Sequence, residues 1–369
     1  MAALWLSACT SDETLENITE NSPVEFGTYV GKDAQTRGAV ADLDKLKSMY
    51  DFAVFAYYTG QNNYSATSTP NFMHNQLVRW GADQWDNRLW VYSPVKYWPN
   101  NEGDKISFFA YAPYSNGGYY KTYITPSSNT AAGDPKITFQ VKDNVGGGPG
   151  TEQIDLLYAD PVLDKTKPGI SEKVTFNFKH ALTRIGFKAE VKIDVANTDG
   201  TGEVDNASVQ GGNIEYLTNF SISKVELIGK FYKSGTLNLN GGSWTPAAAT
   251  EEVIYTLSET GNNLQNHTNI VINKTNLINN DNSYMMLIPK NFTGTDQIKI
   301  RVTYKVRTSD SNLNGGASEI TNVVTSDPFN FNFEQGKAYN FVIHLGMTTA
   351  KFDAQIADWK DATDYVSNN

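Results

Sequence analysis

The 369-residue sequence has one cysteine, Cys9, and no apolar run near the roughly 20 residues that a membrane-spanning helix needs. One cysteine permits neither an internal disulfide nor a cysteine-rich metal site. Only 19% of the residues are charged, and 40 acidic residues against 30 basic ones give a formal net charge of −10. Because the phosphates of nucleic acid would repel such a chain, its charge argues against a nucleic-acid partner.

Sequence motifs for catalysis are also missing. The glycine run at residues 146–150 lacks the Gly-Lys-Ser/Thr ending of a phosphate-binding loop, and no Gly-x-Ser-x-Gly elbow is present. Four histidines occur without the spacing of a metal cluster: His74, His180, His267 and His344. We therefore expect no enzymatic activity, no cofactor and no metal ion.

The residues that are abundant favour β-structure. The chain has 20 Tyr, 18 Phe, 7 Trp and 29 Gly, and aromatic residues suit strands whereas glycine suits tight turns. Short alternating segments, separated by turn residues, recur along the whole chain and predict an all-β protein with antiparallel sheets. The length suggests two domains or one large one, and a Pro- and Gly-containing segment at residues 165–169 gives the expected boundary between sandwiches at residues 24–168 and 169–369.

Local patterns predict several individual elements. Residues 52–57 are apolar on both faces and predict a strand buried between two layers. Residues 95–99 and 105–111 flank a turn that contains Gly103, which predicts a hairpin. Leu43, Leu46 and Met49 are spaced three apart and predict one or two helical turns within residues 41–49.

The amino terminus resembles the end of a bacterial signal peptide. Residues 6–9, Leu-Ser-Ala-Cys, resemble a lipobox, in which the cysteine is lipidated. Residues 1–9 are then the residual signal segment, and the polar and acidic residues 10–23 are a flexible tether. In the alternative interpretation, Cys9 is a free thiol.

A short predicted strand stands before the main fold. Residues 24–30 alternate Val, Phe, Thr and Tyr, as a strand does. A polar loop follows at residues 31–38, bounded by Gly31 and Gly38, and contains one arginine, Arg37.

Aromatic residues gather between positions 80 and 98. They have two interpretations, the core of a sandwich or a stacking platform for sugars. The residues concerned are Trp80, Trp85, Trp90, Tyr92, Tyr97 and Trp98.

Several stretches together resemble the fimbrillin family of Bacteroidales, the Mfa-like and FimA-like subunits of type V fimbriae. They are spread over nearly the whole chain in a consistent order. The matching stretches are residues 51–57 (DFAVFAY), 90–99 (WVYSPVKYWP), 106–113 (ISFFAYAP), 176–180 (FNFKH), 336–341 (GKAYNF) and 356–359 (IADW).

This resemblance implies two transthyretin-like β-sandwich domains in a lipoprotein precursor that Cys9 attaches to the outer membrane. An arginine-specific protease would then cut between Arg37 and Gly38 and release the strand at residues 24–30. A strand from another fimbrial subunit would fill the apolar groove left behind. In the alternative interpretation, Arg37 is an ordinary loop residue and the strand stays.

The resemblance leaves the role of the subunit open between stalk, tip and anchor, with surface adhesion to a host or glycan ligand as the expected activity. Residues 349–356 alternate and are one candidate for a donated strand, whereas residues 360–369 are short and polar. The alternative function is a surface lipoprotein that binds glycans through exposed aromatic residues.

Overall fold

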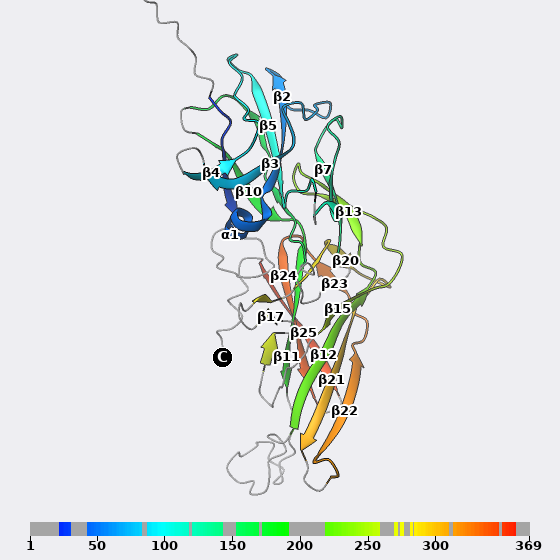
Figure 1. Cartoon of the computed structure of the whole chain (residues 1–369). Coiled ribbons are helices and arrows are strands. Elements are labelled where there is room, and N and C mark those ends of the chain that lie inside the picture. Colours follow the sequence, from blue (N-terminus) through cyan, green and yellow to red (C-terminus); the bar gives the residue numbers. More distant parts are fainter. Residues whose placement is uncertain are drawn as a thin grey trace, which may run out of the picture.

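The structure is a computed structural model. It describes residues 22–30, 43–82, 87–117, 120–142, 153–169, 172–191, 218–258, 269–271, 274–276, 281–282, 284–309, 313–346 and 349–358 of the chain. This part is nearly all β, which confirms the predicted fold class, and the molecule is elongated (Figure 1). Among these residues, no helix has both the length and the apolar character of a membrane span.

Eight strands form the sheet at one end of the molecule. Their order is β1 (Phe26–Val30), β10 (Val174–His180), β8 (Leu157–Ala159), β5 (Lys105–Ala112), β2 (Phe52–Gly60), β3 (Met73–Ala82) and β4 (Arg88–Val91), and β9 (Val162–Lys165) pairs with β5. All described pairs in this sheet are antiparallel except β1 with β10, which run parallel.

Strand β10 lies after the expected boundary at residues 168 and 169, yet it pairs with β8 and β1, which come before that boundary. The division of the chain into two domains stays a prediction. What the structure shows is that the first sheet is built from both sides of that position.

The predicted burial of residues 52–57 between two layers is confirmed. Phe52, Val54 and Ala56 of β2 belong to one apolar cluster, and Ala53 and Phe55 belong to another. The second cluster joins this face to a four-stranded sheet of order β14 (Trp244–Pro246), β13 (Ser234–Asn238), β7 (Lys136–Gln140) and β6 (Ile124–Pro126).

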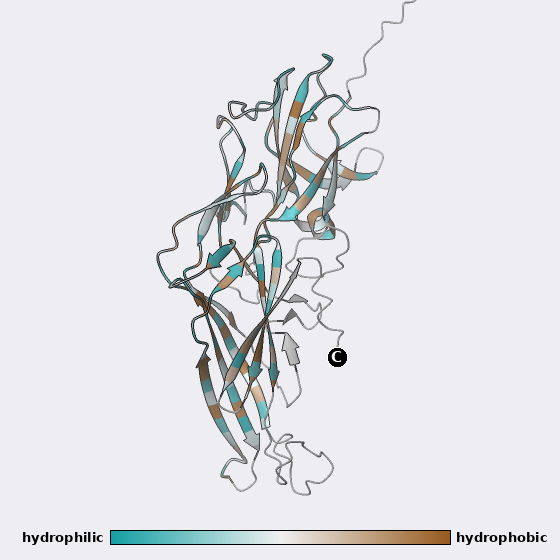
Figure 2. Cartoon of the chain, turned by 180° about the vertical axis from the view of Figure 1, so that it is seen from behind, coloured by the Kyte–Doolittle hydropathy of each residue, from teal (hydrophilic) through white to brown (hydrophobic). Residues whose placement is uncertain are grey.

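Two further sheets form the other end of the molecule. Their inward side chains belong to the same apolar cluster as Ala53 and Phe55. One has the order β16 (Asn269–Val271), β11 (Thr183–Val191), β24 (Lys337–Leu345) and β25 (Ala350–Asp358), with β19 (Met285–Leu287) also paired to β11. The other has the order β15 (Val253–Ser258), β12 (Thr218–Gly229), β21 (Lys299–Ser309) and β22 (Ala317–Thr325). Figure 2 shows apolar and polar bands alternating along its long strands, as expected when one face of a sheet meets the core.

The remaining described elements are short. A helical segment consists of α1 (Leu43–Lys45) and the π-helical turn η1 (Leu46–Tyr50), which confirms the predicted helical turns and extends them by one residue. The others are the 3₁₀ turn η2 (Tyr120–Thr122) and the strand pairs β17 (Lys274–Asn276) with β18 (Asp281–Asn282) and β20 (Lys290–Phe292) with β23 (Phe331–Phe333).

The predicted hairpin between residues 95–99 and 105–111 is wrong. Strand β5 pairs instead with β2, β8 and β9. The backbone on either side of Tyr97 bonds instead to residues 22–24, which lie just before β1, and Tyr97 forms a bridge with Pro23. Sequence alone could not show this pairing, which joins residues far apart in the chain.

Candidate functional site: the groove that holds β1

The segment at residues 22–30 has backbone partners on two sides. The N–H of Val24 donates to the carbonyl of Lys96 (2.8 Å), and the N–H of Trp98 donates to the carbonyl of Ser22 (3.0 Å). On the other side, β1 pairs with β10 from Phe26 opposite Val174 to Val30 opposite Phe178. The segment therefore fills a slot between β10 and residues 96–98.

The inward side chains of this segment enter an aromatic groove. Val24 and Phe26 are 1% and 2% exposed. The ring of Phe26 lies 5.6 Å from that of Phe176 in a stacked arrangement, and it also contacts three further rings, those of Phe52, Tyr92 and Phe108. Burial of a side chain of this size contributes about 1.5–3 kcal/mol, so these two residues supply much of the attachment of β1.

Two polar side chains of the groove also bind the segment. The indole Nε1 of Trp90 donates to Oγ1 of Thr28 (2.9 Å), and Trp90 is only 5% exposed. The hydroxyl of Tyr92 donates to the carbonyl of Val24 (2.8 Å). Burial raises the pKa of Tyr92 to about 12, so this hydroxyl keeps its proton at neutral pH.

An ion pair at the rim of the groove adds little. Lys173 Nζ lies 3.3 Å from a carboxylate oxygen of Glu25, and both side chains are more than 40% exposed. Exposed pairs of this kind contribute between about 0 and 1 kcal/mol. Apolar side chains and backbone hydrogen bonds, rather than charge, hold β1 in the groove.

If β1 left, the groove would expose the rings beneath Phe26 together with the unpaired edge of β10. Such an edge is a template for another extended segment. The arrangement is therefore chemically suited to binding a strand.

The predicted processing and lipidation sites, Cys9, Arg37 and Gly38, lie outside the described residues. The structure brings the predicted strand at residues 24–30 to the edge of the first sheet. Its described part ends at Val30, and the next described residue is Leu43. The lipidation and the cleavage stay predictions.

Most of the described aromatic residues between positions 80 and 98 lie in the core or in the groove that holds β1. Trp90 and Trp98 are 5% and 3% exposed, and Lys47 covers the ring of half-buried Trp80 at 4.6 Å. Tyr97 is 49% exposed, and Trp85 lies outside the described residues. These burials disfavour a sugar platform that uses Trp90 or Trp98. The sequence indicates only core or sugar-binding roles for Trp90 and Tyr92, because no local pattern shows their contacts with residues 24–28.

The three described histidines have separate surroundings. His74 shares a hydrogen bond with the carbonyl of Ser127 (2.8 Å), and His180 shares one with Asp155 (3.0 Å). His344 lies 3.2 Å from Glu190. Within the described ranges, no three His, Cys, Asp or Glu residues come together as a metal site would require, and His267 lies outside these ranges.

Known proteins that resemble this chain match it over most of its length, and they include a solved structure with a similar fold. Residues 39–359 match the model of the fimbrillin-like family. Fimbrium subunit Fim1C of Phocaeicola vulgatus is 28% identical over 99% of this chain and 96% of its own length. The crystal structure of a fimbrial protein from Bacteroides vulgatus, 22% identical, has a TM-score of 0.63 and covers 92% of this chain and 100% of that one, so the two share a fold.

Proposed function

Because the chain belongs to the fimbrillin-like family, we propose that it is a structural subunit of a type V fimbria on the cell surface. The relative of similar length is a fimbrium subunit, which supports a structural rather than an enzymatic role. Adhesion is the activity expected of such a fimbria.

We propose that assembly proceeds by strand exchange. The observation that carries this proposal is the attachment of residues 22–30, which fill a groove through the buried side chains of Val24 and Phe26. Cleavage between Arg37 and Gly38 would separate this segment from the rest of the fold, and a strand of another subunit would take its place. Each subunit fills the groove of the next, and such head-to-tail contacts extend into a filament.

The membrane attachment in this proposal is the lipid on Cys9. Cleavage after Arg37 removes Cys9 together with β1, so a processed subunit loses its own anchor. An anchor subunit would keep both. The first residue of the mature surface form, Cys9 or Gly38, therefore distinguishes these roles.

Replacement of Arg37 tests the exchange. Arg37→Ala should leave a full-length monomer after treatment with an arginine-specific protease, whereas the unaltered chain should give a ladder on gels run without boiling. Lys32→Ala, in the same stretch, is the matched control and should behave like the unaltered chain. A ladder from Arg37→Ala equal to that of the control would contradict cleavage at this position.

A further inference from the structure

Strand β22 forms a long open edge far from the groove of β1. It runs along the outer margin of the sheet β15-β12-β21-β22 (Figure 1), and no other described strand pairs with its free side. Its nine residues pair with β21 without a register shift, from Ala317 opposite Ser309 to Thr325 opposite Arg301.

This edge lacks the features that usually prevent pairing between sheet edges. Proteins protect such edges with short strands, bulges, prolines or charged residues. β22 has no proline and no lysine or arginine, and its only charged residue is Glu319. The other nine-residue edge strand, β25, carries three charged residues, Lys351, Asp353 and Asp358.

Exposed apolar side chains also concentrate here. Val323 is 62% exposed and Ile320 is 54% exposed, more than any other large apolar side chain in the described part of the chain. Leu313, before β22 in the turn that follows β21, is 43% exposed. β-Branched residues with free backbone groups form a surface that an additional strand fits.

The positions of the charged residues indicate what that strand is. In an antiparallel pair of two β22 strands centred on Asn322, Glu319 of one copy stands opposite Thr325 of the other. Thr325 is itself opposite Arg301 in β21, and Arg307 is opposite Glu319 within each copy. Along this cross-strand row, the carboxylate of Glu319 would have Arg307 of its own copy on one side and, beyond Thr325, Arg301 of the second copy on the other, and the two glutamates would not face each other.

The same register pairs the apolar residues. Ile320 stands opposite Val324 of the second copy, on the face where Val324 already packs against the core. Val323 stands opposite Thr321 on the outer face. Cross-strand pairs of β-branched side chains stabilise antiparallel sheets, and a two-fold axis gives each pair twice.

We propose that β22 pairs antiparallel with β22 of a second copy and joins two four-stranded sheets into one of eight strands. One strand pair buries less surface than a standard interface, so two isolated subunits associate weakly. In the filament proposed above, every subunit would present one β22 edge. Two filaments lying side by side could then form many such pairs at once, which would strengthen their association.

The test uses the uncut full-length chain, so strand exchange at β1 plays no part in it. Sedimentation at concentrations up to about 1 mM and near-physiological salt should show a reversible dimer. Val323→Lys and Ile320→Lys should each weaken the dimer about tenfold or more, because each replaces an apolar cross-strand contact with a charge that loses water on pairing. Both positions are exposed, and unchanged thermal unfolding of the monomer would establish that the variants fold.

Ile254→Lys is the matched control, because Ile254 is 46% exposed on β15 at the opposite edge of the same sheet. It should leave the dimer unchanged. A chain that stays monomeric throughout the concentration range would overturn the proposal, as would a dimer that Ile254→Lys weakens and Val323→Lys does not.

Disulfide formation tests the register. In a Cys9→Ser background, a mixture of Thr321→Cys and Val323→Cys chains should form a disulfide-linked dimer, because these positions stand opposite each other across the interface. A mixture of Ile254→Cys and Thr321→Cys chains is the control and should not. Equal cross-linking in both mixtures would reject the pairing of β22 with itself.

Discussion

Strands β1 and β22 both lie at sheet edges, but different interactions hold them. β1 has five residues paired in parallel with β10, and the side chains of Phe26 in β1 and of Val24 just before it are buried in a groove. β22 has nine residues paired antiparallel with β21, and Ile320 and Val323 are exposed. In the proposed assembly, the strand held by backbone bonds and two buried side chains is exchanged for another strand, whereas β22, held by a continuous ladder to β21, only gains a neighbour.

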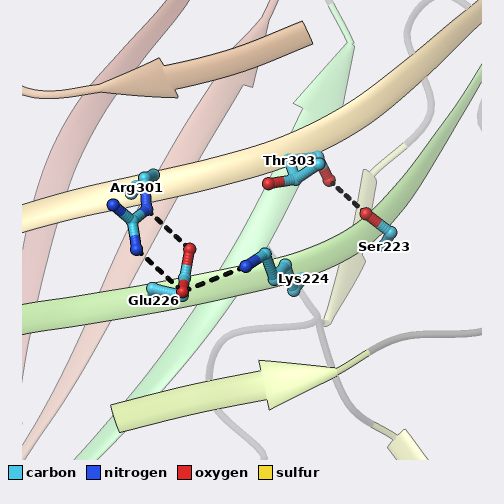
Figure 3. A network of polar contacts seen from close by, with 5 residues as sticks. All are labelled: Ser223, Lys224, Glu226, Arg301 and Thr303. Carbon is cyan, nitrogen blue, oxygen red and sulfur yellow. Dashed lines mark hydrogen bonds and ion pairs between the residues drawn. The ribbon is translucent and has the colours of Figure 1, made fainter. Parts of the chain in front are cut away.

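The sheet that contains β22 has its own polar reinforcement. Arg301 Nε and Nη2 donate to the two carboxylate oxygens of Glu226 at 2.7 and 2.9 Å, and Lys224 lies 3.1 Å from the same carboxylate (Figure 3). At the nearby register shift between β12 and β21, the hydroxyl of Ser223 donates to the carbonyl of Thr303 (3.1 Å). Strands β12 and β21 are thus linked by charge-assisted bonds, whereas the ion pair of Glu25 with Lys173, beside β1, lies at an exposed rim.

The largest expected effect is at Phe26. Phe26→Ala removes a fully packed ring and should destabilise the attachment of β1 by about 3–5 kcal/mol. Hydrogen exchange should show loss of protection in β10 while β12 and β21 stay protected. The control Val323→Ala should change stability by less than about 0.5 kcal/mol, because that side chain is exposed. Equal loss of protection in β12 would show that Phe26 stabilises the whole molecule and not the attachment of β1 in particular.

The next effect concerns Glu226. Glu226→Gln should cost about 2 kcal/mol in urea unfolding at pH 7, because it leaves the Arg301 guanidinium without its carboxylate partner. Its hydrogen bond from Arg301 holds the pKa of Glu226 below the ordinary value of 4.5.

The pH dependence follows from the direction of that shift. Because the folded-state pKa lies below the unfolded one, the stabilisation is complete above pH 4.5 and disappears as pH falls through the folded-state pKa. The difference in stability between the unaltered chain and Glu226→Gln should therefore narrow below pH 4.5. A difference that stays constant down to pH 2 would show that the carboxylate charge is not involved.

Thr28 should have a smaller effect. Thr28→Val keeps the shape of the side chain but leaves the buried Nε1 of Trp90 without its acceptor, at a cost of about 1–2 kcal/mol. Thr28→Ser keeps the hydroxyl and should cost less. Urea unfolding and the rate at which the cleaved segment dissociates would both detect the difference, and equal values for the two variants would exclude a role for this hydrogen bond.

Lys305 should have the smallest effect. Its ammonium lies 2.7 Å from Glu319, but both side chains are almost half exposed. Water and salt screen such a pair, so Lys305→Gln should leave the urea midpoint unresolved from that of the unaltered chain. A clear shift would mean that the edge near β22 depends on charge more than the structure indicates.

Some strands of the fold could be predicted from the sequence, because the pattern of apolar and polar residues that indicates them is local. Alternation at residues 24–30 and apolar faces at residues 52–57 depend only on neighbouring residues, and both strands are present. The groove could not be predicted in detail, because Trp90, Tyr92 and Lys96 meet Val24 and Thr28 across more than 60 residues of sequence. The wrong hairpin has the same cause, since a turn signal at Gly103 says nothing of a distant competing segment.

The position of β10 illustrates the same limit. A Pro- and Gly-containing segment at residues 165–169 is a reasonable break in sequence, but only tertiary pairing shows that Val174 and the residues after it complete the first sheet. The open edge of β22 could not be predicted either, because only the pairing of β21 and β22 shows which strand ends the sheet.

In the proposed assembly, the groove that residues 22–30 fill is occupied by a strand of another subunit in the fimbria. The most direct measurement is the mass and amino-terminal sequence of the subunits within polymers that resist SDS. We expect polymerised subunits to begin at Gly38 and to lack residues 22–30. Polymers whose subunits all retain residues 22–30 in their grooves would contradict it.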